Sequence, residues 1–363
     1  MDIVIVPAIE ISIAILATSD SGSSQSSAMF YPNGDSPLFV DIFVITVTCG
    51  CIAGLYATSI IIVPVDTILS PSDPYSLSNS TAVWALACEF ISGGLVTFMI
   101  SQHLRTRPRF FLRLLAVASL IGQTLTGVAL WIACPAGGGY STLGEVLYYI
   151  AHITFIGPTA VMGFTLGTIY SLRRLPERGW DFARASGMPG FFVSIYTIVW
   201  MWVAFFYLSV VQVGTIAKGY GRLDIFYYGW GIFLFVTLTL SSFMWTAPQP
   251  TVTLVGSNLD TSEPKDSLDQ KDVMSGRGRG AFWPYFFVYV VTLVPGLGLK
   301  LLSGPILQIS YGFPMWAQTI VTTVYIALYG ISRVINPLFC KTPSQVKKMY
   351  AVTRSEATKS ELR

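Results

Sequence analysis

The sequence is short of charged residues and of histidine. Only 11% of its 363 residues are Asp, Glu, Lys or Arg, whereas 53% are hydrophobic; soluble domains carry about 25% charged residues. The net charge of +3 is small for this length, so nothing indicates a nucleic-acid partner. With two histidines and no His-Glu-x-x-His or Gly-x-Ser-x-Gly motif, the sequence offers no metal-hydrolase or acyl-transfer site. The composition therefore predicts a protein immersed in a lipid bilayer, with no enzymatic activity, cofactor or metal.

The five cysteines show neither metal-ligand nor disulfide spacing. Cys49-x-Cys51 lies in an apolar run, where cysteine behaves as a small hydrophobic residue. Only Cys134, at the end of an apolar run, is expected to be exposed.

Long apolar runs fill most of the chain. A membrane-spanning helix needs about 20 apolar residues, and eight runs meet this need, at 38–65, 82–101, 111–134, 146–171, 188–214, 225–246, 281–303 and 315–338. The apolar stretch 3–16 is shorter and is interrupted by Pro7 and Glu10. It fits neither a spanning helix nor an ordinary signal peptide, so an interfacial segment or a misplaced start codon is the better interpretation of this part of the N-terminal tail, 1–37.

Basic residues predict the orientation of these spans. Eighteen Lys and Arg residues lie in one set of loops and in the C-terminal tail: Arg105, Arg107, Arg109, Arg113, Arg173, Arg174, Arg178, Arg184, Lys265, Lys271, Arg277, Arg279, Lys341, Lys347, Lys348, Arg354, Lys359 and Arg363. The alternate loops hold only Lys218 and Arg222. Since cytoplasmic loops carry the excess of Lys and Arg, both termini are expected to be cytoplasmic. The sequon at Asn79 then falls on the outer side, where a glycosylation acceptor is usable.

The loops also suggest a division of the chain. Six spans with short connections occupy 38–246, and the polar stretch 247–280 has the composition of a disordered cytoplasmic linker. Two further spans follow in 281–340, and a basic tail closes the chain at 341–363. We therefore expect an all-α polytopic membrane protein, with a six-helix bundle, a linker and two more helices.

A polar loop separates the fourth and fifth spans. Its stretch "LPERGWDFARASGMPGFF" holds Pro176, Arg178-Gly179, Gly187 and Gly190. This order resembles the Pro, Arg-Gly and Gly-rich pattern of the major facilitator superfamily, in its nodulin-like and monocarboxylate-transporter branches. The arginines are expected to anchor the inner end of the helices. Gly187 and Gly190 would let the fifth span approach a neighbour closely.

Three other stretches resemble the same branches. "GLYATSIIIVPV" looks like the family's first helix, in which Tyr56 would line the central path, and "FWPYFFVYVVTLVPGLGLK", with Gly296 and Gly298, resembles the seventh. "LYGISRVINPLF" is similar to the end of the eighth, where Arg333 falls. The resemblance implies a major-facilitator-like bundle that moves a small solute by alternating access, as a symporter or antiporter.

Two departures from the family stand out. The loop between its second and third spans usually carries Asp-Arg-x-Gly-Arg-Arg, whereas this sequence has Gln102 at the Asp position, then His103 and Arg105, and keeps the basic end at Arg107. The family also has twelve spans and this sequence has eight. The expectation is a truncated gene model, a chain completed by a second copy or a partner chain, or a protein that no longer transports.

Ionisable residues inside spans are functional candidates, since each costs about 2.5–3.5 kcal/mol at a helix centre. Glu89 is either a proton-coupling carboxylate or one side of a helix–helix hydrogen bond, and His152 is either a packing residue or a proton- or metal-contacting group. Lys300 either extends to the membrane interface or binds an anionic substrate. Arg333 either holds a carboxylate or anchors the inner helix end, and Tyr329 occupies the place of the family's Asp.

These residues favour a small organic anion, such as a monocarboxylate, as the solute, with a proton as the coupling ion. The alternative hypothesis for the function is a non-transporting membrane scaffold or sensor.

Overall fold

The structure is a computed structural model that describes residues 36–69, 80–134, 137–178, 180, 182–215, 222–246, 306–307 and 311–339. Helices account for 91% of these residues, and none of them lies in a strand. The linker 247–280, the predicted seventh span 281–303, the basic tail 341–363 and residues 1–35 lie outside the described residues.

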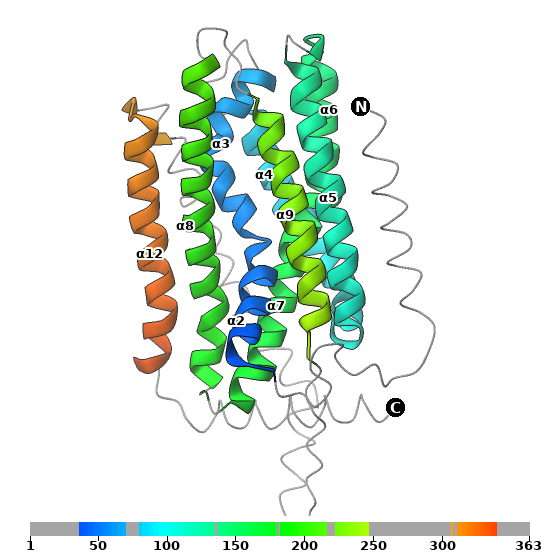
Figure 1. The fold of residues 1–363 in the computed structure, drawn as a ribbon, viewed down its shortest axis with the longest axis vertical. Coiled ribbons are helices and arrows are strands. Elements are labelled where there is room, and N and C mark those ends of the chain that lie inside the picture. The colour runs from blue at the N-terminus through cyan, green and yellow to red at the C-terminus, as the bar shows by residue number, and fades with distance from the viewer. Residues whose placement is uncertain are drawn as a thin grey trace, which may run out of the picture. The chain divides into compact units, whose positions relative to one another are not determined.

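The described chain runs through a series of helices, shown in Figure 1. Their bounds are α2 Leu38–Gly50, α3 Ala53–Leu69, α4 Thr81–Thr106, α5 Pro108–Ala133, α6 Ser141–Ala151, η2 His152–Ile156, α7 Gly157–Glu177, α8 Phe182–Thr215, α9 Leu223–Met244 and α12 Met315–Phe339. Five described stretches are long and apolar enough to cross a bilayer: Thr81–Ser101, Pro108–Ala133, Ser141–Glu177, Arg184–Val210 and Leu223–Met244. The protein is therefore a helical, multi-pass membrane bundle.

The first predicted span is not one continuous helix, which corrects the interpretation of 38–65. The helix stops at Gly50 and starts again at Ala53. Between them, the amides of Cys51 and Ile52 donate to the carbonyls three residues earlier, at 3.4 and 3.3 Å. The aromatic ring of Tyr196 presses on Gly50, where a Cβ would lie 2.7 Å from ring atoms. The break therefore coincides with a close contact between α2 and α8.

The fourth predicted span is interrupted as well, by the π-helical turn η2. Pro158 lies just after this turn and lacks an amide hydrogen. In a regular α-helix its ring would clash with the carbonyl four residues earlier. The amide of Gly157 instead donates to the carbonyl of His152, five residues back. The wide turn admits the proline and keeps α6 and α7 within one membrane crossing. Such turns occur frequently at functional sites.

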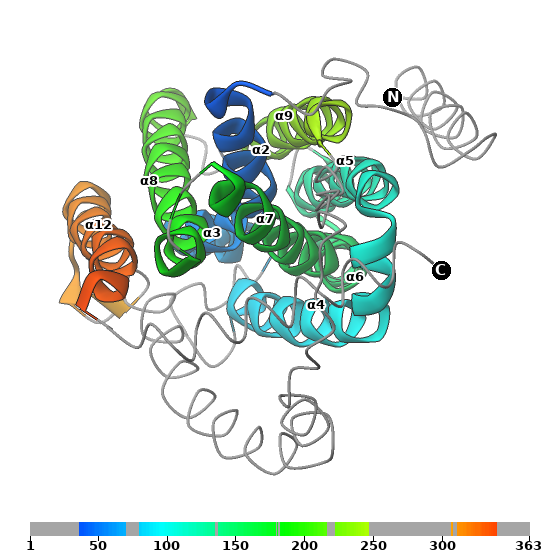
Figure 2. The same ribbon diagram turned by 90° about the horizontal axis from the view of Figure 1, so that it is seen from below.

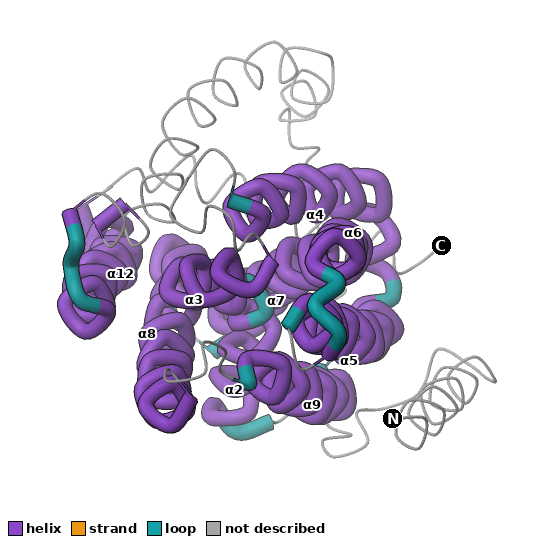
Figure 3. The backbone as a smooth tube through the Cα atoms, turned by 90° about the horizontal axis from the view of Figure 1, so that it is seen from above, coloured by secondary structure: helices purple, strands orange, loops and turns teal. Residues whose placement is uncertain are grey.

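The helices pack in a defined set of pairs, seen along the bundle from its two ends in Figures 2 and 3. α5 lies along α9, α4 along α7, and α12 along α8, whereas α2 contacts both α7 and α8. A cluster of buried apolar side chains contributed by α3, α4, α5, α6, α8, α9 and α12 forms a core.

Glycines bring α4 and α7 into backbone contact. A Cβ on Gly93 would lie 2.4 Å from the carbonyl oxygen of Gly157, and a Cβ on Gly157 would lie 2.5 Å from the carbonyl oxygen of Glu89. Small residues of this kind allow the close helix approach that stabilises membrane bundles. The contact places Glu89 directly beside the π-helical turn.

Candidate functional site

A buried carboxylate–imidazole pair, Glu89 and His152, lies within the apolar part of the bundle. Glu89 projects from α4, His152 is the first residue of η2, and both side chains are almost fully buried. Nδ1 of His152 is bonded to Oε1 of Glu89. Glu89 is eight residues from the start of α4, about 12 Å along the helix, so the pair lies well inside the roughly 30 Å hydrocarbon layer.

The pair keeps two polar atoms without a partner. Oε2 of Glu89 and Nε2 of His152 are buried and have no hydrogen-bond partner among the described residues. Other buried side-chain atoms of the described residues share this state, so what distinguishes Glu89 and His152 is that both are ionisable and lie in an apolar segment. A carboxylate and an imidazole in contact can exchange a proton.

Local structure fixes the geometry of this pair. Gly157 lets the backbone of α7 reach Glu89, and the π-helical turn sets where His152 projects. The ring of Tyr148 stacks on the imidazole, with centroids 4.0 Å apart and planes inclined by 27°. The histidine is therefore held from two sides, by a carboxylate and by an aromatic face.

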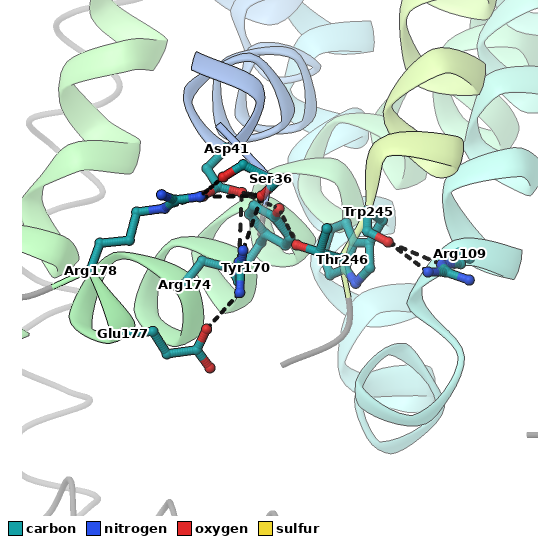
Figure 4. Close-up of polar contacts among 9 residues, drawn as sticks. All are labelled: Ser36, Asp41, Arg109, Tyr170, Arg174, Glu177, Arg178, Trp245 and Thr246. Atoms are coloured by element: carbon teal, nitrogen blue, oxygen red, sulfur yellow. Dashed lines mark hydrogen bonds and ion pairs between the residues drawn. The ribbon is translucent and has the colours of Figure 1, made fainter. Parts of the chain in front are cut away.

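A second polar cluster, which we call the basic-end network, surrounds Asp41 at the ends of α2 and α7 (Figure 4). Oδ1 of Asp41 accepts hydrogen bonds from Ser36 Oγ at 3.0 Å and from the Tyr170 hydroxyl at 2.6 Å. Oδ2 accepts from Nε of Arg178 at 2.5 Å, and Nε of Arg174 lies 3.6 Å from Oδ1. Two guanidinium groups and two hydroxyls thus surround one buried carboxylate.

The network extends to the ends of two further helices. The Tyr170 hydroxyl contacts Thr246 Oγ1 at 2.9 Å, and its ring packs on Trp245 with centroids 4.5 Å apart. Arg109 donates to the carbonyl of Trp245 from Nε and NH2, at 3.1 and 2.8 Å. The network therefore ties α2, α5 and α7 to the residues after α9, as Figure 4 shows.

Arg174 and Arg178 are among the arginines that the sequence predicts to anchor the inner helix ends, whereas Asp41 and Tyr170 were not selected as site residues. Asp41 is an acidic residue inside an apolar run, and the rule that selected Glu89 would have selected it too. No sequence signal identifies Tyr170 as its partner, because the two are 129 residues apart.

Arg333 lies on α12 and pairs with the neighbouring tyrosine. Its NH2 donates to the Tyr329 hydroxyl at 2.6 Å, and the guanidinium lies 4.7 Å from the centroid of the same ring. Gly190 of α8 faces it: a Cβ there would lie 3.0 Å from Cγ of Arg333. The pairing with Tyr329 links the two residues noted in the sequence, and the ion pairs among the described residues do not include Arg333.

The other predicted site residues are dispersed. His103 and Arg107 are exposed around the α4–α5 connection, and Gly187 is buried in α8. The side chains of Tyr56, Gln102 and Arg105, and the whole of Asn79, Gly179, Gly296, Gly298 and Lys300, lie outside the described residues. Of the candidates in the apolar spans, the structure brings together Glu89 and His152.

The described residues contain no group of three or more His, Cys, Asp or Glu side chains that could hold a metal ion. No protein-family model, curated protein or solved structure matches the chain.

Proposed function

We propose that the protein is a secondary transporter that couples the movement of a small solute to proton transfer at Glu89 and His152. The observation that carries this proposal is the buried pair itself, with one open atom on each partner. An ionisable pair inside a membrane segment is costly, and such groups commonly form ion or proton pathways.

The helix pairing supports an internally repeated bundle. We count α2 with α3 as the first crossing and α6, η2 and α7 as the fourth. A repeat of three crossings would exchange the first crossing with the fourth, the second with the fifth and the third with the sixth. Under this exchange the contact of α4 with α7 corresponds to the contacts of α8 with α2 and α3, which are present. The contact of α5 with α6 corresponds to that of α9 with α2, which is present too. The α5–α9 pair maps onto itself. Three-helix inverted repeats of this kind build each half of a major facilitator transporter, the family that the sequence resembles.

The two helix interruptions fall at corresponding places in this scheme. The first crossing breaks after the 13 residues of α2, and the fourth changes to η2 after the 11 residues of α6. Interrupted helices in corresponding positions of two repeats are a structural pointer to the binding site of a secondary transporter. His152 lies at one of these interruptions.

A small organic anion is the solute class that we propose, with Arg333 as its cationic partner on α12. The guanidinium stacks on Tyr329 and pairs with no described carboxylate, so its charge is available to a carboxylate from outside the chain. We further propose that the arginine-rich helix ends, including Arg107 and Arg178, face the cytoplasm, with both termini on that side.

Uptake into proteoliposomes tests the function. The full-length chain would be reconstituted and offered labelled short-chain monocarboxylates with and without an inward proton gradient. We expect the gradient to stimulate uptake by the native chain and to have no effect on Glu89→Gln, because an amide cannot exchange the proton. Absence of gradient-driven uptake of any offered solute by the native chain would contradict the proposal and favour a scaffold or sensor.

A further inference from the structure

The contact between Glu89 and His152 uses one nitrogen of the imidazole and leaves the second nitrogen open. Nδ1 is bonded to Oε1 of Glu89, whereas Nε2 is buried and has no hydrogen-bond partner among the described residues. Within that part of the chain, this bond is the only hydrogen bond that either side chain makes. A proton that the two residues exchange therefore crosses the contact between Nδ1 and Oε1.

This bond couples the tautomer of His152 to the protonation state of Glu89. An ionised carboxylate only accepts hydrogen bonds, so Nδ1 must carry the hydrogen, and a neutral ring then has a bare Nε2. A carboxyl group protonated on Oε1 donates instead, so Nδ1 must be bare and the hydrogen of the neutral ring lies on Nε2. The two protonation states of Glu89 thus require opposite tautomers of His152.

The surroundings of the pair favour neutral side chains. Both side chains are almost fully buried, and charge is costly within a membrane segment. With Glu89 ionised and His152 neutral, the pair carries one negative charge, which one added proton removes. A carboxylic acid beside a neutral imidazole also avoids the desolvation cost of a buried ion pair. The added proton is therefore most stable on the carboxyl group.

Stacking on Tyr148 holds the imidazole in one plane. The two ring centroids lie 4.0 Å apart with planes inclined by 27°, and Tyr148 is itself buried. The stack covers a face of the imidazole, whereas both nitrogens direct their lone pairs or hydrogens within the ring plane. A ring held in this way can take a proton at one nitrogen and release one from the other without rotating.

We propose that His152 relays the coupled proton to Glu89 through its ring. The incoming proton binds the lone pair of Nε2, and the hydrogen on Nδ1 passes to Oε1 of Glu89. An N–H bond forms at Nε2, the N–H bond at Nδ1 breaks and an O–H bond forms at Oε1. The imidazole is neutral before and after, and only its tautomer has changed. The inference rests on the proposed function, because it assigns atoms to the proton transfer at that same site.

Other ionisable side chains surround the pair without a hydrogen bond to it. Of the helices packed on η2, α5 carries none between Arg113 and its end at Ala133, and α7 carries none before Tyr170. The nearby groups on the remaining helices are Asp66 on α3, Cys88 on α4, Glu145, Tyr148 and Tyr149 on α6, and Tyr227 on α9. The relay itself therefore consists of Glu89 and His152.

Nitrogen NMR of the full-length protein in detergent, labelled with nitrogen-15 histidine, tests the relay without any solute. The sequence has two histidines, and the exposed His103 is an internal reference whose signals are assigned by their loss in His103→Gln. We expect His152 to change from the Nδ1–H to the Nε2–H tautomer as the pH falls, whereas His103 becomes an imidazolium with both nitrogens protonated. In Glu89→Gln we expect the tautomer change to disappear, because an amide takes up no proton.

His152→Asn tests the relay during transport. Asparagine keeps a hydrogen-bonding group near Glu89 but has no second nitrogen that could take up the proton. We expect gradient-driven uptake in proteoliposomes to fall by about a hundredfold, the lower end of what one positioned proton-transfer group contributes. The melting temperature of the variant establishes that folded protein is assayed.

The outcomes separate the relay from the function. The relay would be overturned if His152 kept one tautomer or became an imidazolium at low pH, or if His152→Asn showed native gradient-driven uptake. The proposed function would stand in these cases, provided that uptake by the native chain follows the gradient. A tautomer change in a native chain whose uptake ignores the gradient would overturn the function and retain the relay.

Discussion

Asp41 and Glu89, two of the buried carboxylates in the part of the bundle that the structure describes, differ in how completely they are bonded. Both oxygens of Asp41 accept hydrogen bonds, and two guanidinium groups contribute charge to them. Glu89 has one bonded oxygen and one open oxygen, and its partner His152 has an open ring nitrogen. Asp41 has both oxygens engaged, so this carboxylate fixes the helix ends that it joins. A partly bonded pair can change its protonation state, and is therefore suited to function.

The largest effect is expected from breaking the basic-end network. Asp41→Ala would remove the buried carboxylate that Arg174 and Arg178 share and would release the Tyr170 hydroxyl. Loss of one partner of a buried pair costs about 3–5 kcal/mol, so we expect a clear fall in thermal stability in detergent.

Glu177→Gln is the matched control for this substitution. Glu177 also pairs with Arg174, at 2.7 Å, but its side chain is 35% exposed. Exposed pairs contribute about 0–1 kcal/mol. Equal melting temperatures for the Asp41 and Glu177 variants would contradict the structural role of the network.

A smaller effect is expected at the glycine contact that positions Glu89. Gly93→Ala places a Cβ 2.4 Å from a backbone oxygen of α7, so a helix must shift, at about 1–3 kcal/mol. The neighbouring Gly94→Ala meets nothing within 4 Å and should be neutral or slightly stabilising. Measuring the melting temperatures of Gly93→Ala and Gly94→Ala checks this prediction. An unchanged melting temperature for Gly93→Ala would show that the packing of α4 on α7 does not depend on the close contact at Gly93.

The smallest change in stability is expected at the pair itself. Glu89→Gln removes the ionisable carboxylate but keeps a hydrogen-bonding group opposite His152, so the cost should stay near the 0.5–1.5 kcal/mol of one ordinary hydrogen bond. Differential scanning fluorimetry of purified protein measures it. A loss comparable to that of Asp41→Ala would place Glu89 among the structural residues.

The sequence predicted the class of fold and several individual residues, but not their contacts. Apolar runs of bilayer length predict the membrane helices directly. Glu89 and His152 were selected because ionisable side chains are rare within those runs. Their pairing joins residues 63 apart and depends on how α4 packs against α7, which no local pattern encodes. The π-helical turn has a local cause in Gly157-Pro158. The break at Cys51 has no proline beside it, but it directly follows Gly50, and glycine is a poor helix former.

The most direct measurement compares Glu89→Gln and Asp41→Ala for both melting temperature and gradient-driven uptake in proteoliposomes. We expect Glu89→Gln to fold almost normally and to lose the response of uptake to the proton gradient. We expect Asp41→Ala to melt earlier, while the protein that remains folded still responds to the gradient. A gradient response that survives in Glu89→Gln and disappears in folded Asp41→Ala would contradict the assignment of Glu89 as the proton site and of Asp41 as a structural residue.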